Sequence, residues 1–78
     1  MTIQGKKSLQ RRQLGLAIRS RRESFKLSQE KLAELVDAHR NYIGLIERGE
    51  QNLTVDTLCR LSSALKCRPS ELLRAARL

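Results

Sequence analysis

Two neighbouring polar side chains, Arg40 and Asn41, are of types that can read the edges of DNA bases. An arginine can donate two hydrogen bonds to O6 and N7 of guanine, and an asparagine can pair with adenine or bind a phosphate. Both residues come just before a short apolar stripe formed by Ile43 and Ile46, and both fall off that stripe. Helical periodicity therefore predicts a short helix that turns Arg40 and Asn41 toward solvent or a partner.

Catalytic chemistry has few candidate residues in this chain. His39 is its single histidine, and no close acid–base pair or cluster of metal ligands accompanies it. Cys59 and Cys67 lack metal-ligand or CxxC spacing, and each lies among leucines. Their setting predicts two reduced, mostly buried thiols of a cytoplasmic protein, with a disulfide or an intermolecular link as the alternative. We expect no enzymatic activity, no metal, no cofactor and no small-molecule ligand.

The charge of the chain favours a polyanionic partner. Sixteen Lys and Arg residues against eight Asp and Glu give a formal charge of +8 and a pI near 10.5. DNA, RNA and an anionic membrane surface all fit such an excess. No apolar run approaches the roughly 20 residues that cross a bilayer. The basic start is not followed by the apolar segment that a signal peptide needs. The charge alone leaves these three kinds of partner open.

Composition and periodicity predict one small all-α domain. Seventy-eight residues suit a single core, and hydrophobic residues make up 40% of the chain although Phe25 and Tyr42 are its only aromatics. No stretch alternates with period two. The predicted helices cover about 9–24, 28–36, 40–48, 54–65 and a short segment from 69 onward. Residues 1–8 are expected to form a flexible basic N-terminal arm, either solvated or touching phosphate, and residues 9–78 a single domain.

Residues with strong positional preferences support the helix boundaries. Ser28 and Thr54 are suited to cap helix N-termini, and Pro69 suits a first helical position. Gly49 is suited to end a helix, and Asp37 stands where a left-handed residue is commonly required. Only about four residues separate the segments on either side of Asp37, which is the spacing of a helix-turn-helix.

The chain resembles the phage-repressor-like (XRE) helix-turn-helix family over roughly residues 9–74. The residues that carry the resemblance are Leu27-Ser-Gln-Glu-Lys-Leu-Ala33, Tyr42-Ile43, Ile46-Glu-Arg-Gly49, Leu53-Thr54 and Pro69-Ser-Glu-Leu72. This resemblance implies a compact five-helix lambda-repressor-like DNA-binding domain with its helix-turn-helix at about 28–49. The Arg40-Asn-Tyr42-Ile sequence and the Arg48-Gly-Glu-Gln-Asn-Leu-Thr54 loop are most similar to restriction-modification controller proteins.

The resemblance and the chemistry of the side chains together predict the contacts to double-stranded DNA. Base contacts are expected from the outer face of the second helix of the motif, where Gly44 would leave room for close approach and Leu45 would meet a thymine methyl or pack on the core or a partner. These residues are Arg40, Asn41, Gly44 and Leu45. Backbone contacts are expected from Ser28, Gln29, His39, Tyr42, Arg48, Gln51 and Asn52. Tyr42 packing alone and a solvated loop after Arg48 are the alternatives.

Family resemblance also implies two structural features. Arg22 and Glu47 are expected to form an ion pair that ties the first helix to the third. Leucines of the last two helices cannot all face one small core, so a homodimer interface is expected at Leu65, Leu72, Leu73 and Leu78. Four residues depart from the family pattern: Asp37 and Lys66 stand where glycine is common, Arg21 replaces an apolar residue, and Arg68 stands where a Ser or Thr would cap the fifth helix.

The predicted function is sequence-specific transcriptional regulation by a homodimer on a palindromic operator, of the controller-protein type. An antitoxin with a toxin partner and a phage-type repressor are alternatives within the same family. A sequence-tolerant nucleic-acid-binding protein is the alternative outside it, and a steep salt dependence without sequence preference would distinguish it.

Overall fold

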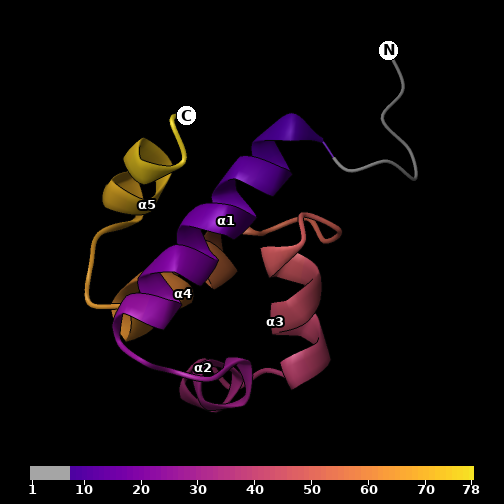
Figure 1. Ribbon diagram of the computed structural model, residues 1–78, viewed down its shortest axis with the longest axis vertical. Coiled ribbons are helices and arrows are strands. Elements are labelled where there is room, and N and C mark those ends of the chain that lie inside the picture. Colours follow the sequence, from indigo (N-terminus) through magenta and orange to yellow (C-terminus); the bar gives the residue numbers. More distant parts are fainter. Residues whose placement is uncertain (1–7) are drawn as a thin grey trace.

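The computed structural model describes residues 8–78, and within that range the chain forms five α-helices and no strand (Figure 1). The prediction of an all-α fold is confirmed. The helices are α1 (Leu9–Ser24), α2 (Gln29–Leu35), α3 (Arg40–Glu47), α4 (Val55–Ala64) and α5 (Pro69–Ala75).

The longest helix, α1, lies between α3 on one side and α5 on the other (Figure 1). The helix α2 packs against α3, and α4 lies behind α1 in this view, in contact with α2 and α5. One face of α3 is therefore covered by α1 and α2, and α5 lies on the far side of α1.

Aliphatic side chains from all five helices form a single core. Its fully buried members include Ile18, Leu32, Ile43, Ile46, Leu61, Leu65 and Leu72. Leu65 is 0% exposed and Leu72 is 1% exposed, so neither side chain is available to a second copy. The prediction that these two leucines form a dimer interface is wrong, because the core of one chain already contains them.

Hydroxyl caps begin three of the helices. The Oγ of Ser28 accepts a hydrogen bond from the backbone N–H of Lys31 at 2.9 Å, and Oγ1 of Thr54 accepts one from Thr57 at 3.0 Å. Ser8 caps α1 in the same way, and it therefore belongs to the domain and not to the expected arm. The remainder of that arm, residues 1–7, lies outside the described residues.

Left-handed residues end α2, α3 and α4. Asp37 and Lys66 both have φ 57°, and Gly49 has φ 75°. Aspartate tolerates this conformation better than most residues, whereas a lysine gains nothing from it. At Lys66 the backbone receives outside support, because Arg21 donates from Nε to the carbonyl of Leu65 at 2.9 Å and from Nη2 to that of Lys66 at 3.0 Å. Arg21 thus caps the C-terminal end of α4 from α1.

A glycine sets the distance between α1 and α3. A Cβ on Gly15 would lie 2.4 Å from the carbonyl oxygen of Ile46 and 2.6 Å from that of Glu47. Backbone atoms cannot yield to a side chain at such distances. Glycine at this position therefore allows α1 and α3 to pack closely, and it sets the position of α3 against the core.

Candidate nucleic-acid interface

The outer face of α3 carries a shallow hollow of about 340 Å³. It is lined by residues from α2, α3 and the end of α3, namely Gln29, Arg40, Asn41, Gly44, Leu45 and Arg48. Arg40, Asn41 and Arg48 are exposed, and Leu45 is half-buried. The structure thus brings together residues that were predicted separately as base contacts and as backbone contacts.

The inner face of α3 holds the helix on the core. Ile43 and Ile46 are both buried there. Tyr42 is half-buried and packs against the core, which both interpretations of this residue predicted, and a contact from its hydroxyl to a phosphate stays a prediction. These contacts leave the opposite side of α3, with Arg40 and Asn41, facing solvent.

A buried carboxylate connects the interface to the scaffold. Glu47 accepts hydrogen bonds from Arg22, with Nε to Oε2 at 2.6 Å and Nη2 to Oε1 at 3.0 Å. The side-chain Nε2 of Gln29 donates to the same Oε1 at 3.0 Å. Arg22 also donates from Nη1 to the carbonyl of Leu27 at 2.6 Å. The expected ion pair therefore forms, and it joins α1, the start of α2 and α3.

The environment of this pair favours its charged form. The hydrogen bond to Glu47 raises the pKa of the Arg22 guanidinium above its ordinary value, although burial acts in the opposite direction. Because Glu47 accepts from its neighbours, the amide of Gln29 must turn its N–H toward Glu47. This leaves the side-chain carbonyl oxygen of Gln29 over Gly44. It lies 3.8 Å from the point where a Cβ on Gly44 would be.

Gly44, which was expected to leave room for a close approach to bases, is buried. The groups nearest to a Cβ on Gly44 would be Nη1 of Arg48 at 3.1 Å and Oε1 of Gln29 at 3.8 Å. The space left by the missing side chain is therefore next to protein groups as well as the hollow that Gly44 lines, and a contact from Gly44 to bases stays a prediction.

Of the residues besides Gln29 that were expected to contact the DNA backbone, only Arg48 lines the hollow. The hydroxyl of Ser28 accepts the capping hydrogen bond of α2. His39 is the exposed N-cap residue of α3 and makes no side-chain capping bond. Arg48 contacts Glu50, with Nε to Oε1 at 3.3 Å. Beyond it, Gln51 is half-buried and Asn52 is exposed.

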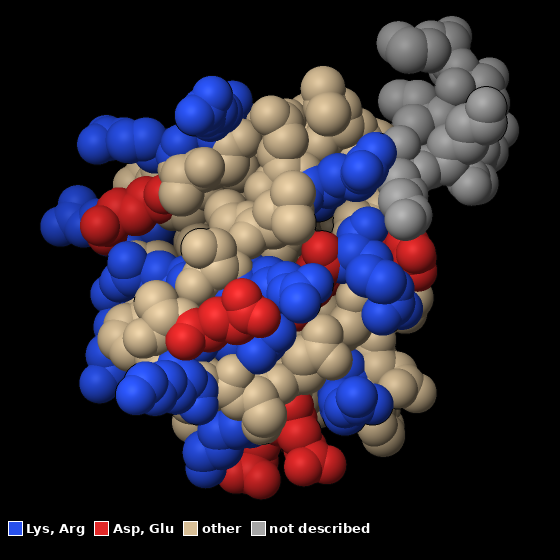
Figure 2. Space-filling model, viewed as in Figure 1, with Lys and Arg blue, Asp and Glu red and all other residues tan. Residues whose placement is uncertain are grey.

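Lysine and arginine are spread over the surface and not confined to one patch. Figure 2 shows basic side chains across this view of the molecule, with acidic side chains lying among them. Some of these form exposed pairs, such as Arg19 with Glu23 at 3.2 Å. The distribution of charge in this view therefore does not by itself single out one face for DNA.

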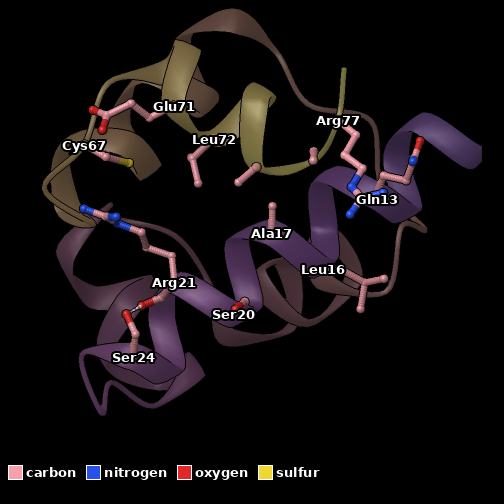
Figure 3. A pocket seen from close by; sticks show the side chains of 12 residues that line it. Gln13, Leu16, Ala17, Ser20, Arg21, Ser24, Cys67, Glu71, Leu72 and Arg77 are labelled. Carbon is pink, nitrogen blue, oxygen red and sulfur yellow. Dashed lines mark hydrogen bonds between the residues drawn. The ribbon is translucent and has the colours of Figure 1, made fainter.

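A larger groove, of about 480 Å³, lies between α1 and α5 (Figure 3). Leu16, Ala17 and Leu72 contribute its apolar surface, and Cys67 and Arg21 lie near one end (Figure 3). Since α3 packs on the other side of α1, this groove is not part of the α3 face. Cys67 is half-buried and Cys59 is exposed, both with free thiols, so the prediction of two mostly buried thiols is wrong for Cys59.

Of the leucines predicted for a dimer interface, two remain outside the fully buried core. Leu73 is half-buried and packs against the core, and Leu78 is 51% exposed. Val55, at the first position of α4, is 74% exposed. Apolar surface therefore does remain on the last two helices.

This geometry agrees with a family match. The family model described as helix-turn-helix (HTH_3) matches residues 18–72, which include all of α2, α3 and α4. The chain belongs to this helix-turn-helix family. No helix in residues 8–78 is long and apolar enough to span a membrane.

Among its relatives are proteins that control restriction-modification systems. The control protein C.SmaI of Serratia marcescens is 48% identical over 56 residues, which are 72% of this chain and 67% of that protein. The crystal structure of the restriction-modification controller protein C.AhdI from Aeromonas hydrophila superposes with a TM-score of 0.77 and 38% identity, over 78% of this chain and 92% of that chain. The similarity to controller proteins that the sequence predicts is confirmed.

The fold is shared more widely than that group. The clp gene regulator ClgR from Corynebacterium glutamicum superposes with a TM-score of 0.87 and 28% identity, over 92% of this chain and 77% of that chain. A helix-turn-helix domain of this kind therefore occurs in proteins that are named for the regulation of different systems, so the fold alone does not identify a target.

Three features of the interface were missed by reading the sequence. They are the close approach at Gly15, the hydrogen bond from Gln29 to Glu47, and the position of the Arg48 guanidinium beside Gly44. A glycine inside a helix costs stability relative to alanine, so Gly15 and Gly44 each carried a signal that something else requires glycine there. The amide-to-carboxylate bond had none, because residues 29 and 47 lie on different helices.

Proposed function

We propose that this helix-turn-helix domain is a sequence-specific DNA-binding transcription regulator of the restriction-modification controller type. The observation that supports this most is the hollow on the outer face of α3 that Gln29, Arg40, Asn41 and Arg48 line together. Names of the relatives, control protein C.SmaI and controller protein C.AhdI, support the same function.

The proposed base-contacting segment is the N-terminal half of α3. A major groove about 12 Å wide admits one helix, and residues at the start of a recognition helix reach the base edges. Arg40 and Asn41 are the exposed residues at that start. We assign Arg40 to a guanine and Asn41 to an adenine, with Leu45 on the same face available to a thymine methyl.

Polar side chains around this base-contacting segment would contact phosphates and so fix the register of α3 on the duplex. Contacts to phosphates position a protein without carrying sequence information, and amides and arginines serve this role. Gln29 and Arg48 lie at the edge of the hollow, and Gln51 and Asn52 follow in the next loop. Because Glu47 holds Gln29, this contact would be presented in a fixed orientation.

We further propose that two copies bind together. An eight-residue helix such as α3 touches only a few base pairs, whereas two copies one DNA turn apart, about 34 Å, read a pseudopalindrome. Apolar surface at Leu73, Leu78 and Val55 is available for a symmetric contact.

Selection of bound sites from a pool of random duplexes tests this function. Purified protein should enrich one sequence with two-fold symmetry and a defined spacing between half-sites. Equal recovery of all sequences, with affinity that depends only on salt concentration, would instead indicate a sequence-tolerant nucleic-acid-binding protein. Enrichment of an unsymmetrical half-site would retain sequence specificity and contradict the dimer.

A further inference from the structure

Gly44 occupies the middle of the face that α3 turns outward, yet it is buried. It lies four residues after Arg40 and four before Arg48, so all three share one side of the helix. A glycine inside a helix destabilises it relative to alanine. The presence of a destabilising glycine on the outer face of α3 therefore needs a structural explanation.

The side chain of Arg48 gives that reason. A Cβ on Gly44 would lie 3.1 Å from Nη1 and 3.9 Å from Cζ of Arg48. The guanidinium therefore lies back along α3, beside Gly44, although Arg48 is the C-cap residue at the end of the helix. Oε1 of Gln29 is also close, 3.8 Å from the same Cβ position.

Gly44 differs in this respect from the other glycine in a helix. At Gly15 a Cβ would meet backbone oxygens of Ile46 and Glu47, which cannot move without shifting α3. At Gly44 it would meet only the ends of two side chains. Folding therefore requires glycine at 15 but tolerates alanine at 44, and the constraint at 44 concerns where the Arg48 guanidinium lies.

We propose that Gly44 is a positioning residue for Arg48, providing the space in which its guanidinium lies against the outer face of α3. This inference rests on the proposed function and assigns the Arg48 contact to a backbone phosphate beside Gln29. A Cβ at position 44 would push the guanidinium off the helix face by a few tenths of an ångström, toward solvent or toward Glu50, which it contacts at 3.3 Å.

A double-mutant cycle with Gly44→Ala, Arg48→Ala and the pair tests the proposal on duplex DNA. Affinity is measured against salt concentration, because each lost phosphate contact makes the plot of log K against log salt less steep by about 0.9. Arg48→Ala should lower the slope by about this amount for each protomer bound and weaken binding by about tenfold for each charged hydrogen bond lost. Gly44→Ala should likewise reduce the affinity for DNA and make its salt dependence less steep. The protein should remain at least as resistant to urea as the wild type.

The decisive comparison is Gly44→Ala in the two backgrounds. If Gly44 serves Arg48, the alanine substitution has no further effect once Arg48→Ala is present. An equal loss of affinity in both backgrounds, with an unchanged salt slope, would mean that the methyl group meets DNA directly and would overturn the proposal. So would wild-type affinity and slope in Gly44→Ala.

This test is separable from that of the proposed function. A phosphate contact does not depend on sequence, so the cycle can be measured on any duplex that the protein binds. Failure to enrich a sequence from the random pool would contradict the proposed function and leave the cycle interpretable. Additivity in the cycle would contradict the role of Gly44 and leave sequence specificity intact.

Discussion

The guanidinium of Arg22 and the carboxylate of Glu47 form a buried, two-point ion pair between α1 and α3, with Nε to Oε2 at 2.6 Å and Nη2 to Oε1 at 3.0 Å. Oε1 of Glu47 also accepts from Gln29, the first residue of α2. One carboxylate therefore belongs to both the scaffold and the proposed DNA interface. A change at Glu47 should be felt in stability and in DNA binding together.

Glu47→Ala is expected to destabilise the domain by about 3–5 kcal/mol, because it removes the buried carboxylate that Arg22 contacts at two points and leaves that cation with only the Leu27 carbonyl and the more distant Glu23. Unfolding in urea, followed by circular dichroism, measures this loss. The double variant Arg22→Met with Glu47→Leu is the control, since replacing both charges by apolar groups of similar size should recover most of the stability. Unchanged stability in Glu47→Ala would contradict the structural role of the pair.

Gly15→Ala is expected to destabilise the domain by about 1–3 kcal/mol, because its Cβ would press on the backbone oxygens of Ile46 and Glu47. Gly44→Ala is the matched control, a glycine-to-alanine change in another helix, and should stabilise by up to about 1 kcal/mol. Urea midpoints of the two variants give the comparison. If both variants moved in the same direction, the close approach of α1 to α3 would not be what requires glycine at position 15.

Arg40→Ala should relax specificity at one base pair in each half-site and cost about 1–3 kcal/mol per contact. Competition between the selected operator and variants of it at each position measures this effect. Arg77→Ala removes the same charge from the groove between α1 and α5, on the far side of α1, and should weaken binding slightly and equally for all sequences. The same uniform loss in Arg40→Ala would assign Arg40 to a phosphate.

Much of this fold could be predicted from the sequence because its signals are local. Ser28, Thr54, Gly49 and Pro69 mark helix ends through their own backbone and side-chain preferences, and the structure has each of them at that position. The family pattern added the pairing of Arg22 with Glu47, which no local preference contains.

Features that depend on packing between helices could not be predicted in the same way. Periodicity marks Leu65 and Leu72 as apolar but cannot say whether an apolar face meets its own chain or a second copy, and the structure places both in the core. Arg21 is another example, since its role at the C-terminal end of α4 depends on where α4 lies against α1.

Cys59 is expected to react with a thiol reagent before Cys67 does. Burial raises the pKa of the Cys67 thiol, so less of the reactive thiolate is present at a given pH, and the side chain is half-buried, whereas Cys59 is exposed. Mass spectrometry after timed alkylation at pH 8 identifies the first site. In Cys59→Ser the first modification should become slow and should accelerate in urea. Fast alkylation of that variant in buffer would show that the groove between α1 and α5 opens readily.

Leu73→Glu is expected to weaken self-association and DNA binding together. Leu73 is a half-buried leucine of α5 at the edge of the core, and a charge there would be forced against any apolar partner surface. Sedimentation velocity over a range of concentrations, together with operator titrations, measures both effects. Circular dichroism must first show that the variant keeps its helices, because Leu73 also packs on the core.

Leu16→Glu is the matched control for this prediction. It places the same charge on a leucine of α1 that is 60% exposed in the groove on the far side from α3, and it should leave both quantities unchanged. If Leu73→Glu remained folded and bound the operator as the wild type does, the contact between copies would lie elsewhere or be absent. If Leu16→Glu alone became monomeric, the groove between α1 and α5 would be the contact, and the two copies of α3 would be held apart by the whole width of the domain.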